Sequence, residues 1–555
     1  MCMLLIIPNI RIFKLTFNLF KALKLLVILE IATQLFCAFG VLFKAVNNRI
    51  NFHSRANVQK VLKKGAHFTG FLLTFKSPSR PLFERFSSNS IEIIDQLVHR
   101  MGMTHFIDLT DTLYGYLALL IFFVGYYFVI AEDRTHLAKS KPMMVAAGLI
   151  WLLVGLGYTL NGQPEQAGQL LEHTLLEYAE LFLFLLSAMT FIHALEERHL
   201  FLALRSWLIA RDFSLRTVFW VTGGLTFILS PIADNLSTAL LMGSVVMAVG
   251  TRTATFVLLG LINVVVAANA GGVFSPFGDI TSLMVWQQEK LKFLEFTHLI
   301  IPALISWIVP ALVLNHFLPT GPAQLPHEQQ SMKPGAMVIL ALFLTTITAS
   351  VLIHSLLKLP PVIGMMTGLG ALKIYGYLLS KQDPLLQESE LRGHHMGAST
   401  KHLKGDHGEV VMRFDNFRVV ERASWDTLMF FYGVVLSVGG LAALGYLALI
   451  SNSLYGSFGE TTAHLIIGLS SSLIDNIPVM YAILSMDIPL SSSQWLLATL
   501  CIGIGGSLLS IGSAAGVALM GQANGIYTFK AHLKWSWAIL LGYALSAGYH
   551  IAFTL

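Results

Sequence analysis

The chain has 555 residues, of which 55% are hydrophobic and 12% are charged, and its formal net charge is +5. With a mean hydropathy of +0.68, this composition indicates a polytopic membrane protein rather than a soluble one, and the small charge argues against nucleic-acid binding. The three cysteines, Cys2, Cys37 and Cys501, have no metal-ligand spacing and predict no disulfide framework.

Residues 1–102 form a basic and apolar N-terminal extension. Up to Ser87 it holds 13 Lys and Arg residues against two acids, Glu30 and Glu84. It is open to three interpretations: a membrane anchor with a basic flank, a targeting segment, or sequence upstream of a true start at Met101 or Met103. We assign it no function and place the transmembrane domain at residues 103–555.

Apolar spans close to the 20 residues needed to cross a bilayer follow from Leu113. The loops Glu132–Lys141 and Glu196–Arg216 are net basic and are expected in the cytoplasm, whereas Gln163–Glu177 is net acidic and is expected outside. The expected spans of the first half are Leu113–Ala131, Met143–Leu160, Leu175–Leu195, Val218 to Asp234, Asn235–Val249 and Thr253–Ala270.

The second half mixes full spans with shorter apolar segments. The segments His464–Leu473, Val479–Leu484 and Leu496–Leu509 are too short to cross alone and predict hairpins or broken helices. The polar loop 381–425 contains four histidines, His394, His395, His402 and His407, and a solvated linker is favoured there over a metal site. The full spans are Leu299–Phe317, Ala336–Leu356, Pro361–Leu379, Leu428–Ile450 and Trp535–Phe553.

One apolar stretch, Thr226–Leu241, places Asp234 and Asn235 close to Pro231. Since proline removes a backbone donor, we expect the helix to break around Ser230 and Pro231. Ionisable groups at membrane depth mark functional sites, and irregular backbone there lines a wet cavity or packs in protein. The stretch predicts a site, the alternative being a re-entry point near an ordinary loop.

The same pattern recurs downstream. In Leu469–Val479 a serine-rich approach is again followed by Asp475, Asn476 and a proline, and Gly271–Gly278 aligns with Gly505–Gly512. Paired interrupted segments in two halves of a chain indicate a transporter binding site. We therefore predict an all-α polytopic membrane protein with broken helices or re-entrant hairpins in two inverted repeats, at about 175–290 and 428–530.

Four acids lie in apolar surroundings. Asp234 and Asp475 are related by the repeat, and Asp279 follows a proline–glycine interruption. An unpaired acid costs about 3 kcal/mol at the bilayer centre, so these three predict function. Glu180 has an interfacial and a functional interpretation, and both stay open.

Serine, threonine and asparagine side chains gather beside these acids. Hard cations prefer carboxylate, amide, hydroxyl and carbonyl oxygens. Any one Ser or Thr is expected to bond to its own helix, but the clustering at the breaks indicates a cation site.

Three segments, Ser230–Thr238, Gly271–Thr281 and Ser471–Pro478, resemble those of the NhaD-type sodium/proton antiporters of the ion transporter superfamily. The resemblance covers about Met103 to the C-terminus and departs at Ser282, where a second threonine is expected. It implies exchange of Na⁺ or Li⁺ for H⁺ across the cell inner membrane, with no cofactor and no nucleic-acid partner; a homodimer is one oligomeric state to test. The implied ion- and proton-binding residues are Ser230, Asp234, Asn235, Asn269, Asp279, Thr281, Ser471, Asp475, Asn476, Ser510 and Ser513, with Na⁺ at Asp234, Asn235, Asp475 and Asn476.

Two other functions compete with this interpretation. A carrier of anions or of a neutral oxyacid would use neutral tips and helix N-termini, whereas here each break carries an aspartate. An intramembrane aspartyl protease would need Gly-x-Gly-Asp, and this chain has Pro276 in the first glycine position before Asp279. The internal repeat also favours transport.

Competition of Na⁺ and H⁺ for one buried carboxylate is the simplest coupling. Asp234 is the first choice for the proton carrier because it lies beside Pro231 in a longer apolar stretch than Asp475. Desolvation in such a stretch favours the neutral acid. If Asp279 lies beside it, the two titrate as a pair.

Overall fold

The computed structural model describes residues 107–135, 137–209, 213–250, 253–321, 332–381, 424–523 and 525–555. The chain divides into two compact units, Met1–Thr104 and His105–Leu555, and every described residue belongs to the second. The N-terminal extension, and the polar loop with its four histidines, lie outside the described residues.

Within those ranges the secondary structure is helical and contains no strand. This confirms the predicted all-α polytopic class. Nine helices of the described part are long and apolar enough to cross a membrane. They are α4 (Leu113–Ile130), α6 (Ser140–Leu160), α7 (Pro164–Glu197), α9 (Leu215–Ala233), α11 (Ala254–Gly272), α13 (Ile300–His316) with the preceding 3₁₀ helix η1 (Phe293–Leu299), α14 (Ala336–Leu357), α15 (Val362–Lys381) and α18 (Trp425–Ala443).

Shorter helices complete this unit, and several of them stop inside the packed core. They are α5 (Glu132–Thr135), α8 (Leu200–Ile209), α10 (Asn235–Val249), α12 (Ile280–Gln287), α19 (Tyr446–Phe458), α20 (Glu460–Ser470), α21 (Asn476–Leu484), α22 (Ser492–Gly505), η2 (Gly506–Leu508), α23 (Ala514–Gln522), α24 (Phe529–Leu533) and α25 (Ser536–Phe553).

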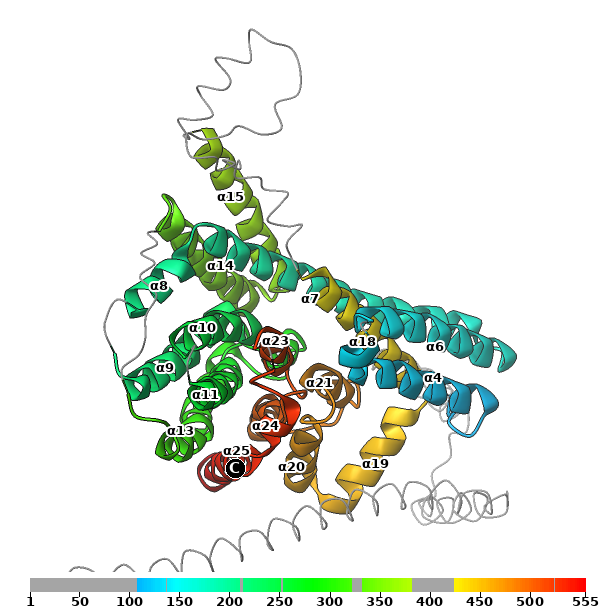
Figure 1. Cartoon of the computed structure of the whole chain (residues 1–555). Coiled ribbons are helices and arrows are strands. Elements are labelled where there is room, and N and C mark those ends of the chain that lie inside the picture. Colours follow the sequence, from blue (N-terminus) through cyan, green and yellow to red (C-terminus); the bar gives the residue numbers. More distant parts are fainter. Residues whose placement is uncertain are drawn as a thin grey trace, which may run out of the picture. The chain divides into compact units, whose positions relative to one another are not determined.

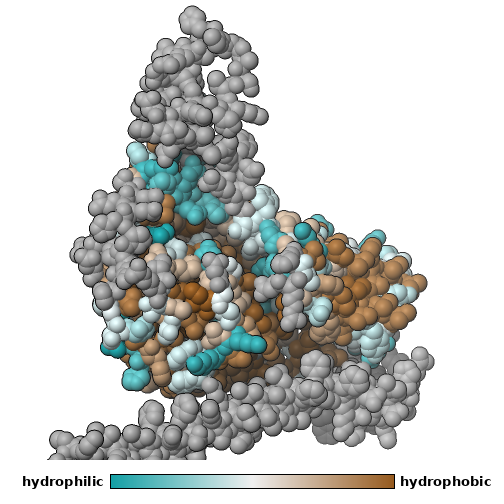
Figure 2. All heavy atoms as spheres, in the orientation of Figure 1, coloured by the Kyte–Doolittle hydropathy of each residue, from teal (hydrophilic) through white to brown (hydrophobic). Residues whose placement is uncertain are grey.

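Helix packing separates a peripheral group from a central one (Figure 1). Helices α4, α6 and α18 pack together, and the long α7 runs from them to α14 and α15. Helix α11 is almost wholly buried and contacts α9, α10, α13 and α22. The outward side of α4 and α6 is apolar (Figure 2), with Leu120, Tyr127 and Leu152 exposed, as expected of a surface that faces lipid.

Two predictions about helix boundaries are wrong. Pro231 does not break its helix: α9 continues through it to Ala233 and ends at Asp234, whose φ is 56°. Pro231 removes the one bond that its amide would make to the Phe227 carbonyl, and only two further helical residues follow it before α9 ends. The expected span Leu428–Ile450 is two helices, because Gly445, with φ of 98°, separates α18 from α19.

Candidate functional site

The first helix break lies between α9 and α10 and is made by Asp234. Its Oδ1 accepts a hydrogen bond from the Ser237 amide at 2.8 Å, and its Oδ2 accepts one from the Ser237 hydroxyl at 2.8 Å. The backbone amide of Asn235 donates to the Gly278 carbonyl at 3.0 Å. Asp234 is thus the N-cap of α10, and both its oxygens are engaged by the helix that it caps.

The second break lies between α20 and α21 and is made by Asp475. This residue also precedes the first helical residue, yet its side chain makes no capping bond. Its Oδ1 is buried without a hydrogen-bond partner among the described residues. Its Oδ2 lies 3.9 Å from Lys139 Nζ. The same Asp-Asn pair therefore leaves its carboxylate uncapped here.

A hairpin follows each break, made of α11 and α12 after the first and of α22 and α23 after the second. Each hairpin makes the same contacts with the helix that precedes its break. Ser230 donates its hydroxyl proton to the Ala268 carbonyl at 2.6 Å, and Ser471 donates to the Ile502 carbonyl at 2.9 Å. Gly271 lies against the Phe227 carbonyl as Gly505 lies against that of Gly468, so close that a Cβ would collide with the backbone. Ser230 and Ser471 stand at the same distance before their Asp-Asn pairs, and so do Phe227 and Gly468, so the two segments make equivalent contacts.

Asp279 lies in the first hairpin, directly before α12, and caps that helix. Its side chain is 4% exposed, and its Oδ2 accepts a hydrogen bond from the Thr281 hydroxyl at 2.8 Å. The amide of Asn476, at the second break, approaches its two oxygens at 3.4 and 3.3 Å. In the second hairpin the equivalent cap, on α23, is Ser513, which accepts from the Gly516 amide at 3.3 Å.

Asp279 and Asp475 are linked through Asn476, which follows Asp475 in the chain and whose side chain reaches the Asp279 carboxylate. The Asp234 side chain instead folds back onto the first turn of α10. The coupling of Asp279 to Asp234 stays a prediction.

A chain of amides joins the first break to the second hairpin. Asn235 donates to the Asn269 oxygen at 3.2 Å, and Asn269 donates to the Ser507 hydroxyl at 2.8 Å. The Ser507 carbonyl lies 2.9 Å from His532 Nε2, and Tyr527 is 2.8 Å from the other ring nitrogen. These side chains are buried, so the chain fixes Asn235 and Asn269 relative to the second repeat.

The remaining predicted residues are Ser510 and Glu180. Ser510 is buried, and its hydroxyl has no hydrogen-bond partner within the described ranges. Glu180 lines a cavity of about 200 Å³ together with Glu177, Tyr481 and Gln288. Glu177 accepts hydrogen bonds from Gln288 at 2.7 Å and from Tyr481 at 2.8 Å. This cavity lies at the C-terminal ends of α12 and α21, whereas Asp279 and Asp475 lie at their N-terminal ends.

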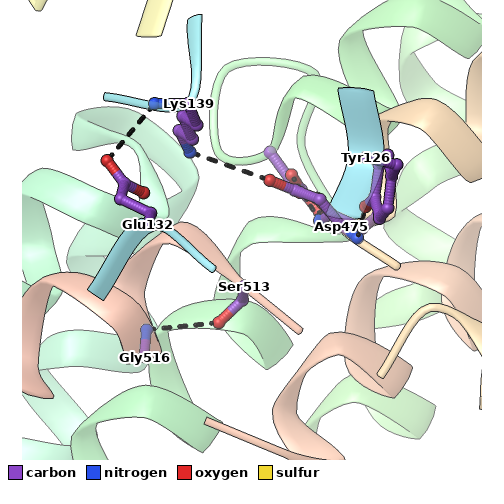
Figure 3. A network of polar contacts seen from close by, with 8 residues as sticks. Tyr126, Glu132, Lys139, Asp475, Ser513 and Gly516 are labelled. Atoms are coloured by element: carbon purple, nitrogen blue, oxygen red, sulfur yellow. Dashed lines mark hydrogen bonds and ion pairs between the residues drawn. The ribbon is translucent and has the colours of Figure 1, made fainter. Parts of the chain in front are cut away.

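Sequence reasoning missed three residues at the site. Ser507 directly follows the aligned glycines, and that position could have indicated it. Tyr126 accepts a hydrogen bond from the Asp475 amide at 2.9 Å, and Lys139 approaches the carboxylate of Asp475 (Figure 3). Neither has a sequence signal, because Tyr126 lies in the first span and Lys139 in the turn before the second, more than 300 residues away from Asp475.

The donor set suits a small hard cation. It offers two carboxylates, the amides of Asn476 and Asn269 and the hydroxyl of Ser510, all oxygen donors. Among the described residues no group of three or more His, Cys, Asp or Glu could hold a metal ion. A multi-pass helical protein with carboxylates at two paired helix breaks is, as a class, a secondary membrane transporter.

Comparison with known proteins agrees with this class. The family model described as "Citrate transporter" matches residues 126–503. The Na⁺/H⁺ antiporter NhaD of Vibrio cholerae is 52% identical over 80% of this chain and 93% of its own length, and that of Alkalimonas amylolytica is 51% identical over 80% and 92%. Sodium/proton antiporter 1 of Arabidopsis thaliana is 31% identical over 78% of this chain and 70% of its own. The chain belongs to the NhaD family of Na⁺/H⁺ antiporters and is a transporter rather than an enzyme.

Proposed function

We propose that this protein exchanges Na⁺ for H⁺ across the cell inner membrane at the cluster of Asp279, Asp475 and Asn476. The observation that carries the proposal is the buried Asp279 carboxylate, which receives the Asn476 side chain from the second break. A buried carboxylate is costly to keep charged unless a cation or a proton lies close to it. Either ion satisfies that requirement.

Na⁺ is proposed to bind through oxygens that the fold leaves available. These are the Asp279 carboxylate and the unpartnered Oδ1 of Asp475, with the Ser510 hydroxyl as a further ligand. Asn476, whose side-chain nitrogen donates to Asp279, is proposed to supply its side-chain oxygen. Asp234, Asn235 and Asn269 would hold the first break in place, while Ser230, Ser471, Thr281 and Ser513 support the backbone around the site. Li⁺ is proposed as a second cation because it prefers the same oxygens.

Coupling follows from competition. When a proton neutralises the acid pair, the attraction for Na⁺ falls, and when Na⁺ binds, it favours loss of the proton. The pair titrates as a unit, so neither acid alone is assigned the proton.

Alternating access is proposed to arise from two inverted repeats. Its support is the crossed packing of the half-helices: α10 of the first repeat contacts α23 of the second, and the equivalent α21 contacts α12. Such a two-fold arrangement lets one repeat move against the other around the shared site. The cavity at Glu177 and Glu180 is proposed to attract cations toward that site. A homodimer is the oligomer that we propose to test by chemical cross-linking in the membrane.

An anion carrier of the same family is the second candidate, because the matching family model is described as "Citrate transporter". Fixed carboxylates at the centre would repel a citrate anion, so a cation is favoured.

The test uses everted membrane vesicles and a pH-sensitive dye. Addition of Na⁺ should release protons through the wild-type chain, and Asp279→Asn should abolish the release while inserting normally. Asp487→Asn is the matched control, because Asp487 is 90% exposed in a surface pair with Lys290. Exchange that survives Asp279→Asn at wild-type rate would place the ion elsewhere. Citrate uptake without Na⁺-driven proton release would support the second candidate.

A further inference from the structure

Lys139 lies in the turn between α5 and α6, outside every segment that predicted the site. Its Nζ is 3.9 Å from Asp475 Oδ2, and the two side chains are 17% and 14% exposed. Its Nζ also lies 4.5 Å from the centre of the Phe430 ring, a cation–π contact. A lysine in a basic membrane loop normally extends its ammonium to water or lipid headgroups, whereas this one turns it inward (Figure 3).

Contacts from neighbouring elements hold this lysine in place. The Lys139 amide donates to Glu132 Oε1 at 3.4 Å, and the adjacent Ser140 donates its hydroxyl proton to Asp426 of α18. On the other side of the pair, the hydroxyl of Tyr126 accepts from the Asp475 amide. The ammonium is therefore presented to Asp475 by the fold.

The pair is close enough for strong attraction and too long for a hydrogen bond. Asp475 Oδ1 remains without a partner among the described residues. A cation that binds Asp475 would lie near the ammonium and be repelled by it, since like charges a few ångströms apart interact strongly away from bulk water.

We propose that Lys139 is a tethered cation that competes with Na⁺ for Asp475. It acts through Asp475, so it is a positioning residue that lowers the affinity of the site for Na⁺. It thereby favours release of the ion, and it neutralises the carboxylate once the ion has left. This inference rests on the proposed Na⁺ site.

The experiment measures proton release against Na⁺ concentration, at one fixed pH, in vesicles that contain the full chain. For Lys139→Gln we expect the half-saturating Na⁺ concentration to fall about threefold or more, because a repulsive neighbour is gone, and the maximal rate to fall because release slows. Lys139→Arg should stay near wild type, since the charge is kept. Lys141→Gln, at an exposed lysine of the same loop, should change nothing.

If Lys139 had only a structural role, its replacement would not lower the half-saturating Na⁺ concentration. If Lys139→Gln inserts normally and its half-saturating Na⁺ concentration stays the same or rises, the proposal is overturned. Lys139→Met keeps most of the side-chain length against Phe430 and gives the same readout if the glutamine variant does not insert. A wild-type chain without Na⁺-driven proton release would instead overturn the proposed function itself.

In the Asp475→Asn background, Lys139→Gln should have no further effect on Na⁺ affinity, measured by calorimetry on the purified protein. An equal effect in both backgrounds would show that Lys139 does not act through Asp475.

Discussion

The two helix breaks contain the same Asp-Asn pair and use it in different ways. At the first break, both oxygens of Asp234 are bound by Ser237 in the first turn of α10. At the second break, Asp475 makes no capping bond; its Oδ2 lies near Lys139, and its Oδ1 has no hydrogen-bond partner within the described residues.

One residue contributes to the difference. Three positions after the aspartate, where a capped helix offers an amide proton and often a hydroxyl, the first break has Ser237 and the second has Pro478. Proline has no amide proton. Pro478 therefore cannot bind the carboxylate of Asp475, which is left for other partners. Two equivalent segments thus hold their carboxylates differently, and the loss of one donor contributes to that difference.

The largest effect is expected from removal of charge at the second break. Asp475→Asn should reduce exchange at least about tenfold, a loss of about 1.4 kcal/mol of interaction, while the protein still inserts, because a neutral amide is easier to bury. The measurement is Na⁺-driven proton release in everted vesicles, with Asp487→Asn as control. Wild-type exchange with unchanged Na⁺ affinity would remove Asp475 from the site.

Restoring the missing cap should have the next largest effect. Pro478→Ser gives the second break the donors of the first, so we expect the Asp475 carboxylate to turn toward α21 and the half-saturating Na⁺ concentration to rise about threefold or more. Pro478→Ala restores only the amide proton and should have a smaller effect. If neither variant changes the Na⁺ dependence, the proline does not explain the asymmetry.

Weakening the cap of the first break should affect stability more than transport. Ser237→Ala removes one hydrogen bond to Asp234 and should lower the free energy of unfolding by about 1 kcal/mol, with less change in Na⁺ dependence than Pro478→Ser. Thermal unfolding of the purified protein, followed by tryptophan fluorescence, measures the first effect. Ser244→Ala, whose hydroxyl donates to its own helix at the Leu241 carbonyl, is the matched control; an equal loss in both variants would contradict a special role for the cap.

The smallest effect is expected from truncation. The residues of both breaks and both hairpins lie between positions 215 and 522, so a protein that begins at Met103 should insert and exchange Na⁺ as the full chain does. Normal insertion with loss of exchange would show that residues 1–102 contribute to transport.

The class of fold and the presence of a break near each Asp-Asn pair could be predicted from the sequence, because apolar span length and the repeated Asp-Asn pair are local signals. The exact end of α9 could not, since the helix runs past Pro231 to Ala233. The partner of Asp279 could not be predicted. Asp234 is only 45 positions away from it in sequence, yet the side chain that reaches Asp279 from a helix break is that of Asn476, because the Asp234 side chain is held by Ser237. Tyr126 and Lys139 were missed for a related reason: packing of α4 and the α5–α6 turn against the second repeat has no local pattern.

The contacts of Gly271 and Gly505 have a mechanical consequence. At these points α11 meets α9, and α22 meets α20, backbone against backbone, with no side chain between them to change rotamer. Closely packed helix pairs of this kind resist deformation, so each pair is expected to move as a rigid unit. Bending would then concentrate at the hinges, which are Asp234 and residues 471–475. At the second joint the proposed ion ligand Asp475 is itself part of the hinge, so binding of the ion would bear directly on the stiffness of the joint that must move.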